Sequence, residues 1–169
     1  MNGAHIHLIL NHIPVVGILF CTGLLLVAMI RKSPDVRRVA LWSFVVVAAL
    51  TIPTYLTGDP AEGTLRGVSG VTREAIHAHE DMAFITMIGA EIAGILAIFG
   101  LVMMRKPEGT PAWLMTVLLV LSLAICVLMV ITSTRGGEIR HPEIAPGWVA
   151  PASPQRGPGG TAGEGPGRP

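Results

Sequence analysis

The sequence predicts an all-α membrane protein, a four-transmembrane-helix up-and-down bundle, and three observations lead to this fold class. Of its 169 residues, 51% are hydrophobic and only 14% are charged, whereas about a quarter are charged in a typical soluble domain. The apolar residues form four long runs, each close to the roughly 20 residues that cross a bilayer core of about 30 Å. No strand-like alternation competes, and helices satisfy their own backbone hydrogen bonds within lipid.

The four predicted spans are bounded by residues that typically begin and end helices. The spans cover residues 6–30, 39–56, 74–104 and 111–133. Thr72 or Ser69 can cap the third span, and Thr110-Pro111 places a cap and a first-turn proline before the fourth. Gly58-Asp59-Pro60 is expected to end the second span, and Gly136-Gly137 the fourth.

Two prolines lie inside these runs. Pro14 either kinks the first span or begins its membrane-crossing part, which would leave residues 4–12 as an interfacial turn. Both arrangements agree with the sequence. Pro53 is expected to be tolerated as a kink, as prolines are in membrane helices.

The spans form one domain, residues 1–145, and the remainder differs in composition. Residues 146–169 contain six prolines and seven glycines and few residues that a core could bury. This composition predicts a disordered tail.

Basic residues predict the orientation. The two short loops that join spans one to two and three to four carry six of them: Arg31, Lys32, Arg37, Arg38, Arg105 and Lys106. The opposite side carries four: Arg66, Arg73, Arg135 and Arg140. The positive-inside rule therefore places the short loops in the cytoplasm of a bacterial cell. A multi-pass protein of the cytoplasmic (inner) membrane with both termini extracytoplasmic is expected.

The two halves of the chain resemble each other. His5-x-His7 opens the first span and His77-x-His79 opens the third, and a basic pair follows each span at intervals of 26 residues (His5 to Arg31) and 28 residues (His77 to Arg105). This spacing predicts two related hairpins repeated about an axis along the membrane normal, with a chance match as the alternative.

All six histidines fall at the same predicted face of the membrane: His5, His7, His12, His77, His79 and His141. Histidines on facing helices can supply both axial ligands of haem b within an apolar bundle. His12 and His79 are the first candidates, followed by His77. The remaining histidines are candidates for a second haem, and Arg135 and Arg140 can pair with propionates.

Two other interpretations of the histidines stay open. Three or four of the six imidazoles, with Asp81, could bind a zinc or copper ion in a metal-binding or transport protein. Alternatively, histidines suit the headgroup region without binding anything. The chain would then be a structural accessory subunit without a cofactor.

Glu91 lies near the middle of the third span, where an ionisable residue is costly and rare. Its spacing from Glu80 predicts that it faces the histidine side, with its acid group bonded to a hydroxyl such as that of Thr22, Thr51 or Ser122. Glu91 is a candidate proton carrier or a hydrogen-bonded core residue.

Four segments resemble a family of small, uncharacterised bacterial four-helix membrane proteins. They are His5-Ile6-His7-Leu8-Ile9-Leu10-Asn11-His12-Ile13-Pro14, Thr57-Gly58-Asp59-Pro60-Ala61-Glu62, His79-Glu80-Asp81 and Gly136-Gly137-Glu138-Ile139-Arg140-His141. The resemblance extends over residues 5–143 and implies the architecture but no activity. Membrane cytochromes b are similar only as histidine-bearing helical bundles.

The function expected from these features is electron transfer. The chain would hold a redox cofactor at the extracytoplasmic face and pass electrons between membrane quinol and a periplasmic redox protein or a larger membrane complex. No phosphate-binding loop, nucleophile elbow or haem-attachment motif is present, so stand-alone catalysis is not expected. The net charge of +1 gives no indication of nucleic acid binding.

Overall fold

The computed structural model of the protein describes residues 2–65, 68, 70–107 and 109–149, and within these residues all regular structure is helical. The elements are α1 (Gly3–Leu10), α2 (His12–Arg31), α3 (Pro34–Leu56), α4 (Gly58–Leu65), α5 (Arg73–Met103), α6 (Ala112–Glu138) and the short 3-10 helix η1 (Pro142–Ile144). Four segments are long and apolar enough to span a membrane: Gly3–Arg31, Pro34–Leu65, Arg73–Met103 and Ala112–Glu138. The predicted fold class is confirmed.

Some expectations fall on residues that the structure does not describe. The predicted tail lies outside the described residues from position 150 onward, as do the alternative cap Ser69 and the loop cation Arg66.

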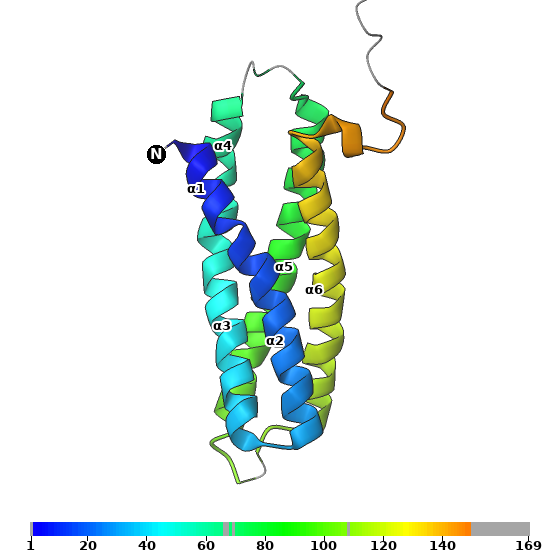
Figure 1. The fold of residues 1–169 in the computed structure, drawn as a ribbon. Coiled ribbons are helices and arrows are strands. Elements are labelled where there is room, and N and C mark those ends of the chain that lie inside the picture. Colours follow the sequence, from blue (N-terminus) through cyan, green and yellow to red (C-terminus); the bar gives the residue numbers. More distant parts are fainter. Residues whose placement is uncertain (1, 66–67, 69, 108, 150–169) are drawn as a thin grey trace, which may run out of the picture.

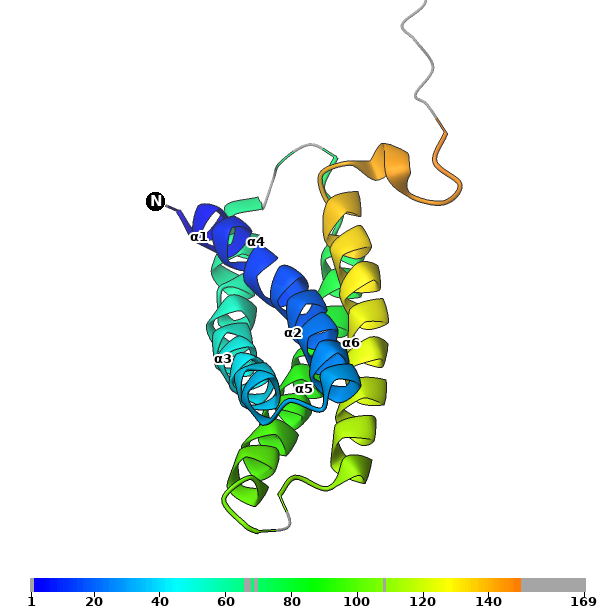
Figure 2. The same cartoon turned by 60° about the horizontal axis from the view of Figure 1, so that its bottom comes forward.

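The four spans run side by side, with both short loops at one end of the bundle and the N-terminal helix and η1 at the other (Figure 1). α2 packs against α3 and α6, and α5 packs against the same two helices, so α2 and α5 lie diagonally across the bundle. At the end away from the short loops α1 packs against α4. Both views show this pair leaning away from α5 and α6 (Figure 2).

Small residues on α5 allow the helices to approach closely. Its buried face includes Ala90, Ala93, Gly94, Ala97 and Gly100. A Cβ atom on Gly94 would lie only 2.6 Å from the Cβ of Ala48 on α3. In lipid, helices associate through such close packing, because apolar burial gives little advantage over contact with lipid tails.

The two hairpins repeat one another in their contacts. Gly17 on α2 packs against Val47 on α3, and Gly89 on α5 packs against Ile125 on α6. The glycines are 72 positions apart in the sequence, and their partners are 78 apart. The predicted relationship between the hairpins therefore extends from the sequence to equivalent helix contacts.

One predicted helix end agrees with the structure and one differs. α3 ends at Leu56, as predicted for the second span, but after Thr57 the chain begins the short helix α4 at Gly58, which was not predicted. α6 continues through Gly136 and Gly137 to Glu138. A glycine is tolerated in a helix when it serves close packing, and Gly136 packs against His79.

The helix starts agree more closely with the predictions. Thr72 caps α5, since its side chain accepts a hydrogen bond from the backbone N–H of Ala75. The start of α6 is displaced by one residue, because Pro111 is the cap. Thr110 is buried and donates instead to the backbone carbonyl of Gly100 at 3.2 Å, at the end of α5.

Pro14 explains the interruption between α1 and α2. The first span is already helical at Gly3, so residues 4–10 form a helix rather than a turn. Pro14 lies in the first turn of α2, where its missing N–H would be unpaired in any case. In a continuous helix Pro14 could not donate to the Leu10 carbonyl, and its ring would clash with that carbonyl. The helix is therefore interrupted at Asn11.

Candidate histidine site

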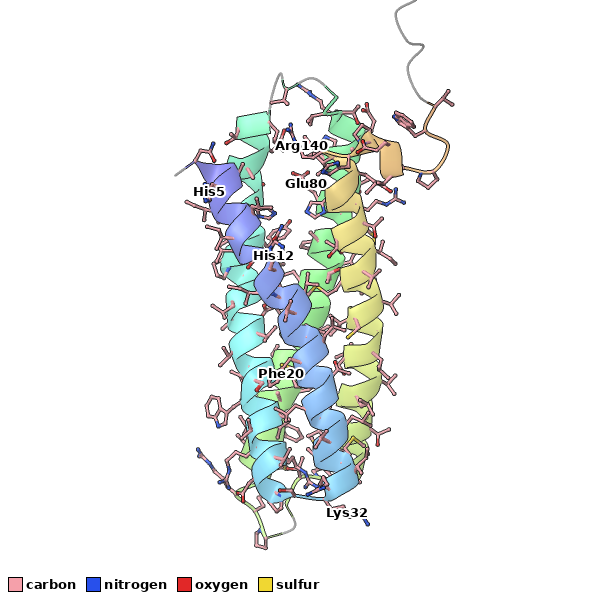
Figure 3. The ribbon with its side chains drawn as sticks, in the orientation of Figure 1. His5, His12, Phe20, Lys32, Glu80 and Arg140 are labelled. Carbon is pink, nitrogen blue, oxygen red and sulfur yellow. The ribbon has the colours of Figure 1, made fainter. Side chains whose placement is uncertain are left out.

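The six histidines lie at the end of the bundle away from the two short loops. They are placed by α1, by the beginnings of α2 and α5, and by the residue before η1. Figure 3 shows His5, His12, Glu80 and Arg140 toward this end, with Lys32 at the opposite end. We call this end of the bundle the histidine end.

His7 on α1 is half-buried and held by α3 and the residue that follows it. Its Nδ1 lies 3.2 Å from the backbone oxygen of Thr54 and 3.0 Å from Oγ1 of Thr57. The Thr57 hydroxyl donates to the same Thr54 oxygen at 2.7 Å. Because a carbonyl only accepts, Nδ1 carries the proton and donates, which leaves Nε2 of the neutral ring with a free lone pair.

His79 on α5 is held in the same way by α6. Its Nδ1 donates to the backbone oxygen of Thr132 at 3.0 Å, and Nε2 is again the unprotonated nitrogen of the neutral ring. The ring lies against Gly136, where an added Cβ would come within 3.1 Å of Cε1. The Thr132 hydroxyl shares a 2.9 Å hydrogen bond with Thr86 on α5, which ties the two helices together.

The two rings meet between the diagonal spans. Their centres are 6.4 Å apart and their planes are nearly perpendicular, at 85°. His7 and His79 are separated by 72 positions, and their carbonyl partners Thr54 and Thr132 by 78. These are also the separations of the two glycine contacts, so the two imidazoles occupy equivalent positions in the two hairpins.

The other four histidines are exposed and are held locally or not at all. His12 donates from Nδ1 to the Leu8 carbonyl at 2.9 Å. His77 lies 3.1 Å from Glu80, and His141 lies 3.0 Å from Glu143. A backbone hydrogen bond and the one with His141 lower the pKa of Glu143.

The predicted pairing of His12 with His79 is therefore not the contact that the structure contains. His7 precedes His12 by five residues, which turns the two side chains about 140° apart on a helix. His7 is the one that points into the bundle, since it is half-buried and His12 is exposed.

The charged residues predicted for the site are peripheral. Arg135 pairs with Glu138 on its own helix at 3.2 Å, while Arg140 and Asp81 are exposed. Across residues 2–65, 68, 70–107 and 109–149, no three histidine, cysteine, aspartate or glutamate side chains come together in a group that could hold a metal ion.

The predicted hydrogen bond of Glu91 is wrong. Its Oε1 is buried without a partner, whereas Thr22, Thr51 and Ser122 donate to carbonyls of their own helices. Glu91 also follows His79 by twelve residues, about 18 Å along α5 and a third of a turn around it. It is therefore no part of the histidine pair.

Sequence reasoning missed the supports of the two rings, Thr54, Thr57, Thr132 and Gly136. The signal for the pair itself was present in the repeat, because the second histidine of each His-x-His occupies the equivalent position. This equivalence would have selected His7 rather than His12 as the partner of His79.

Comparison with known proteins establishes the family but not an activity. No curated protein and no solved structure matches the chain. A family model described as "Predicted membrane protein (DUF2231)" matches residues 3–141, which include all four spans and all six histidines. The chain therefore belongs to the DUF2231 family of predicted membrane proteins.

Proposed function

We propose that this membrane protein binds haem b between His7 and His79 and acts as an electron-transfer subunit. The observation that carries the proposal is the pair itself. Two imidazoles from diagonal spans lie in an edge contact, each with its Nδ1 proton donated to a backbone carbonyl and with Nε2 as its unprotonated nitrogen. Metal-binding histidines commonly have this arrangement, because the second hydrogen bond fixes the tautomer and the ring direction.

The distance between the rings fits two ligands on one metal. Imidazoles that bind from opposite sides, each through a metal–nitrogen bond of about 2 Å, have ring centres roughly 6 Å apart. The observed separation is 6.4 Å.

The number of ligands favours haem over a bare metal ion. A structural zinc site needs four protein ligands and a catalytic one needs three. Haem iron takes its equatorial ligands from the porphyrin and needs two axial imidazoles at most. The described residues offer two imidazoles in contact with each other, and no larger group of ligating side chains.

A bound haem would supply reversible one-electron transfer. We propose membrane quinol as one redox partner and a periplasmic redox protein or larger membrane complex as the other, with the histidine end outside the cytoplasm. The basic short loops support this orientation. Arg140, exposed at the histidine end, is the candidate to pair with a propionate, because Arg135 already pairs with Glu138.

The test is an optical spectrum of the protein purified in mild detergent from cells supplied with haem, before and after reduction with dithionite. We expect the Soret band and the sharp reduced α and β bands of a haem with two imidazole ligands. His7→Ala and His79→Ala should each lose them. His12→Ala and His77→Ala are matched controls that should keep them, since both rings are exposed.

Two results would contradict the proposal. A featureless spectrum from folded wild-type protein would exclude haem, and metal analysis would then show whether the pair holds zinc or copper. A haem spectrum that survives His7→Ala but is lost in His12→Ala would restore the pairing of His12 with His79.

A further inference from the structure

An apolar groove lies on the outer surface between α2 and α3, toward the short-loop end. It has a volume of about 460 Å³, within the range of small-molecule sites. Its walls include Phe20, Val39, Trp42 and Val46, with Arg38 as its charged residue. Phe20 and Trp42 are 61% and 55% exposed, so their side chains flank an open slot that faces the lipid.

The groove is about as long, measured along α3, as one leaflet of the bilayer is thick. Arg38 and Val47, both in its lining, are nine residues apart on α3, which is about 13 Å along the helix. This is nearly half of a hydrocarbon core of about 30 Å. The Ser43 hydroxyl in the wall donates to the Val39 carbonyl, so its hydrogen is not available to a ligand in the slot. The slot thus suits an acyl chain that runs from the headgroup region toward the bilayer centre.

Arg38, in the groove lining, belongs to a basic segment of the chain. Between residues 31 and 38 the chain carries four cations, Arg31, Lys32, Arg37 and Arg38, against the single acid Asp35. Among the residues that the structure describes, none of these cations has an ion-pair partner. An anionic headgroup would supply the acceptors that the exposed Arg38 guanidinium lacks.

We propose that this groove is a binding site for an anionic glycerophospholipid, with one acyl chain along Phe20 and Val46 and the phosphodiester at Arg38. The proposal does not depend on haem binding, because the groove lies at the opposite end of the bundle from the histidine pair. Arg38 supplies the specificity for charge, and the apolar slot accepts the chain of any lipid.

Quenching of Trp42 fluorescence by brominated lipids tests the site. Trp113→Phe combined with Trp148→Phe leaves Trp42 as the sole tryptophan. The protein is reconstituted in phosphatidylcholine vesicles that contain a small fraction of brominated phosphatidylglycerol or brominated phosphatidylcholine of the same chain length. We expect phosphatidylglycerol to be favoured at Trp42 by roughly fivefold, the effect of about one favourable basic contact.

Two controls distinguish a site from diffuse attraction of anionic lipid. Arg38→Gln should bring the preference close to one, whereas Arg105→Gln, which removes a cation from the other short loop, should leave it unchanged. A variant with Trp113 as the sole tryptophan reports on the start of α6, outside the groove. An equal preference at Trp113, or a preference at Trp42 that survives Arg38→Gln, would overturn the proposal.

Discussion

Gly136→Ala should weaken haem binding while leaving the bundle folded. Gly136 has no side chain, and the His79 ring occupies the space where one would be. An alanine Cβ would lie 3.1 Å from Cε1 and 3.2 Å from Nδ1 of that ring. Non-bonded carbon atoms are comfortable at about 3.5–4.0 Å, so the imidazole must retreat by about 0.4 Å or more.

The two consequences of this retreat differ in size. Overpacking costs about 1–3 kcal/mol, but alanine in place of glycine in a helix returns about 0.5–1 kcal/mol. The net loss of stability is therefore only about 0–2.5 kcal/mol. The ligand geometry suffers more, because the 3.0 Å bond to Thr132 that orients the ring is disturbed. Changes in such supporting contacts lower metal affinity about 10–100-fold.

The assay is a haem titration of apoprotein in detergent, followed at the Soret band, with thermal unfolding measured on the same preparations. Gly23→Ala on α2 is the matched control, since its Cβ would meet nothing within 4 Å. It should bind haem as the wild type does and unfold slightly later. Wild-type affinity in Gly136→Ala, in a protein that still needs His79, would refute the view that this glycine positions the ring.

Three further changes test other parts of the structure. Thr57→Val removes the hydroxyl that accepts from His7 but keeps the neighbouring carbonyl, so haem affinity should fall about tenfold in the same titration, with unchanged unfolding. Gly94→Leu should separate α5 from α3, because even its Cβ would lie 2.6 Å from that of Ala48; a loss of about 1–3 kcal/mol is expected in unfolding by denaturant, and wild-type stability would contradict the packing. The carboxyl of Glu143 has a lowered pKa. Its contact with His141 should therefore persist as the pH falls through the ordinary pKa of glutamate, and be lost only as the pH falls through the lowered pKa. Carboxyl chemical shifts in a pH titration measure this, and an ordinary glutamate titration would speak against the contact.

The sequence was sufficient for the fold because a bilayer leaves few choices. Four apolar runs of sufficient length must be helices in lipid, and the predicted spans agree with the observed ones within a few residues over most of their ends. The exceptions are segments where the chain leaves the hydrocarbon region, such as α4, which follows α3 after Thr57. Gly58 and Pro60 were expected to stop a helix, but proline also suits a first turn.

The site was harder to predict because it depends on which way side chains turn at a helix break. The end of the bundle that carries the histidines followed from the spans alone. The choice between His7 and His12 did not, since the interruption at Asn11 and the turn of about 140° between the two rings decide which one faces inward. The hydrogen bonds to the backbone carbonyls of Thr54 and Thr132 could not be predicted from residue types, because every residue has a backbone carbonyl.

The repeat also gives Glu91 a counterpart, and the comparison leads to a prediction. The position 72 residues earlier is Leu19, which is 56% exposed on the outer surface of α2. Glu91 thus occupies a place that in the first hairpin faces lipid, and its Oε1 is buried without a partner.

Glu91→Leu should therefore make the second hairpin more like the first and stabilise the bundle by about 1–3 kcal/mol, since an unpaired buried polar group is removed. Haem affinity should not change, because the residue lies about 18 Å along α5 from His79. Unfolding in detergent and the haem titration measure the two quantities. Ala90→Leu, at a buried neighbouring position, is the control and should destabilise. A Glu91→Leu protein that unfolds earlier than wild type would show that the carboxyl has a partner within the bundle, and a simultaneous loss of haem would connect it with the histidine pair.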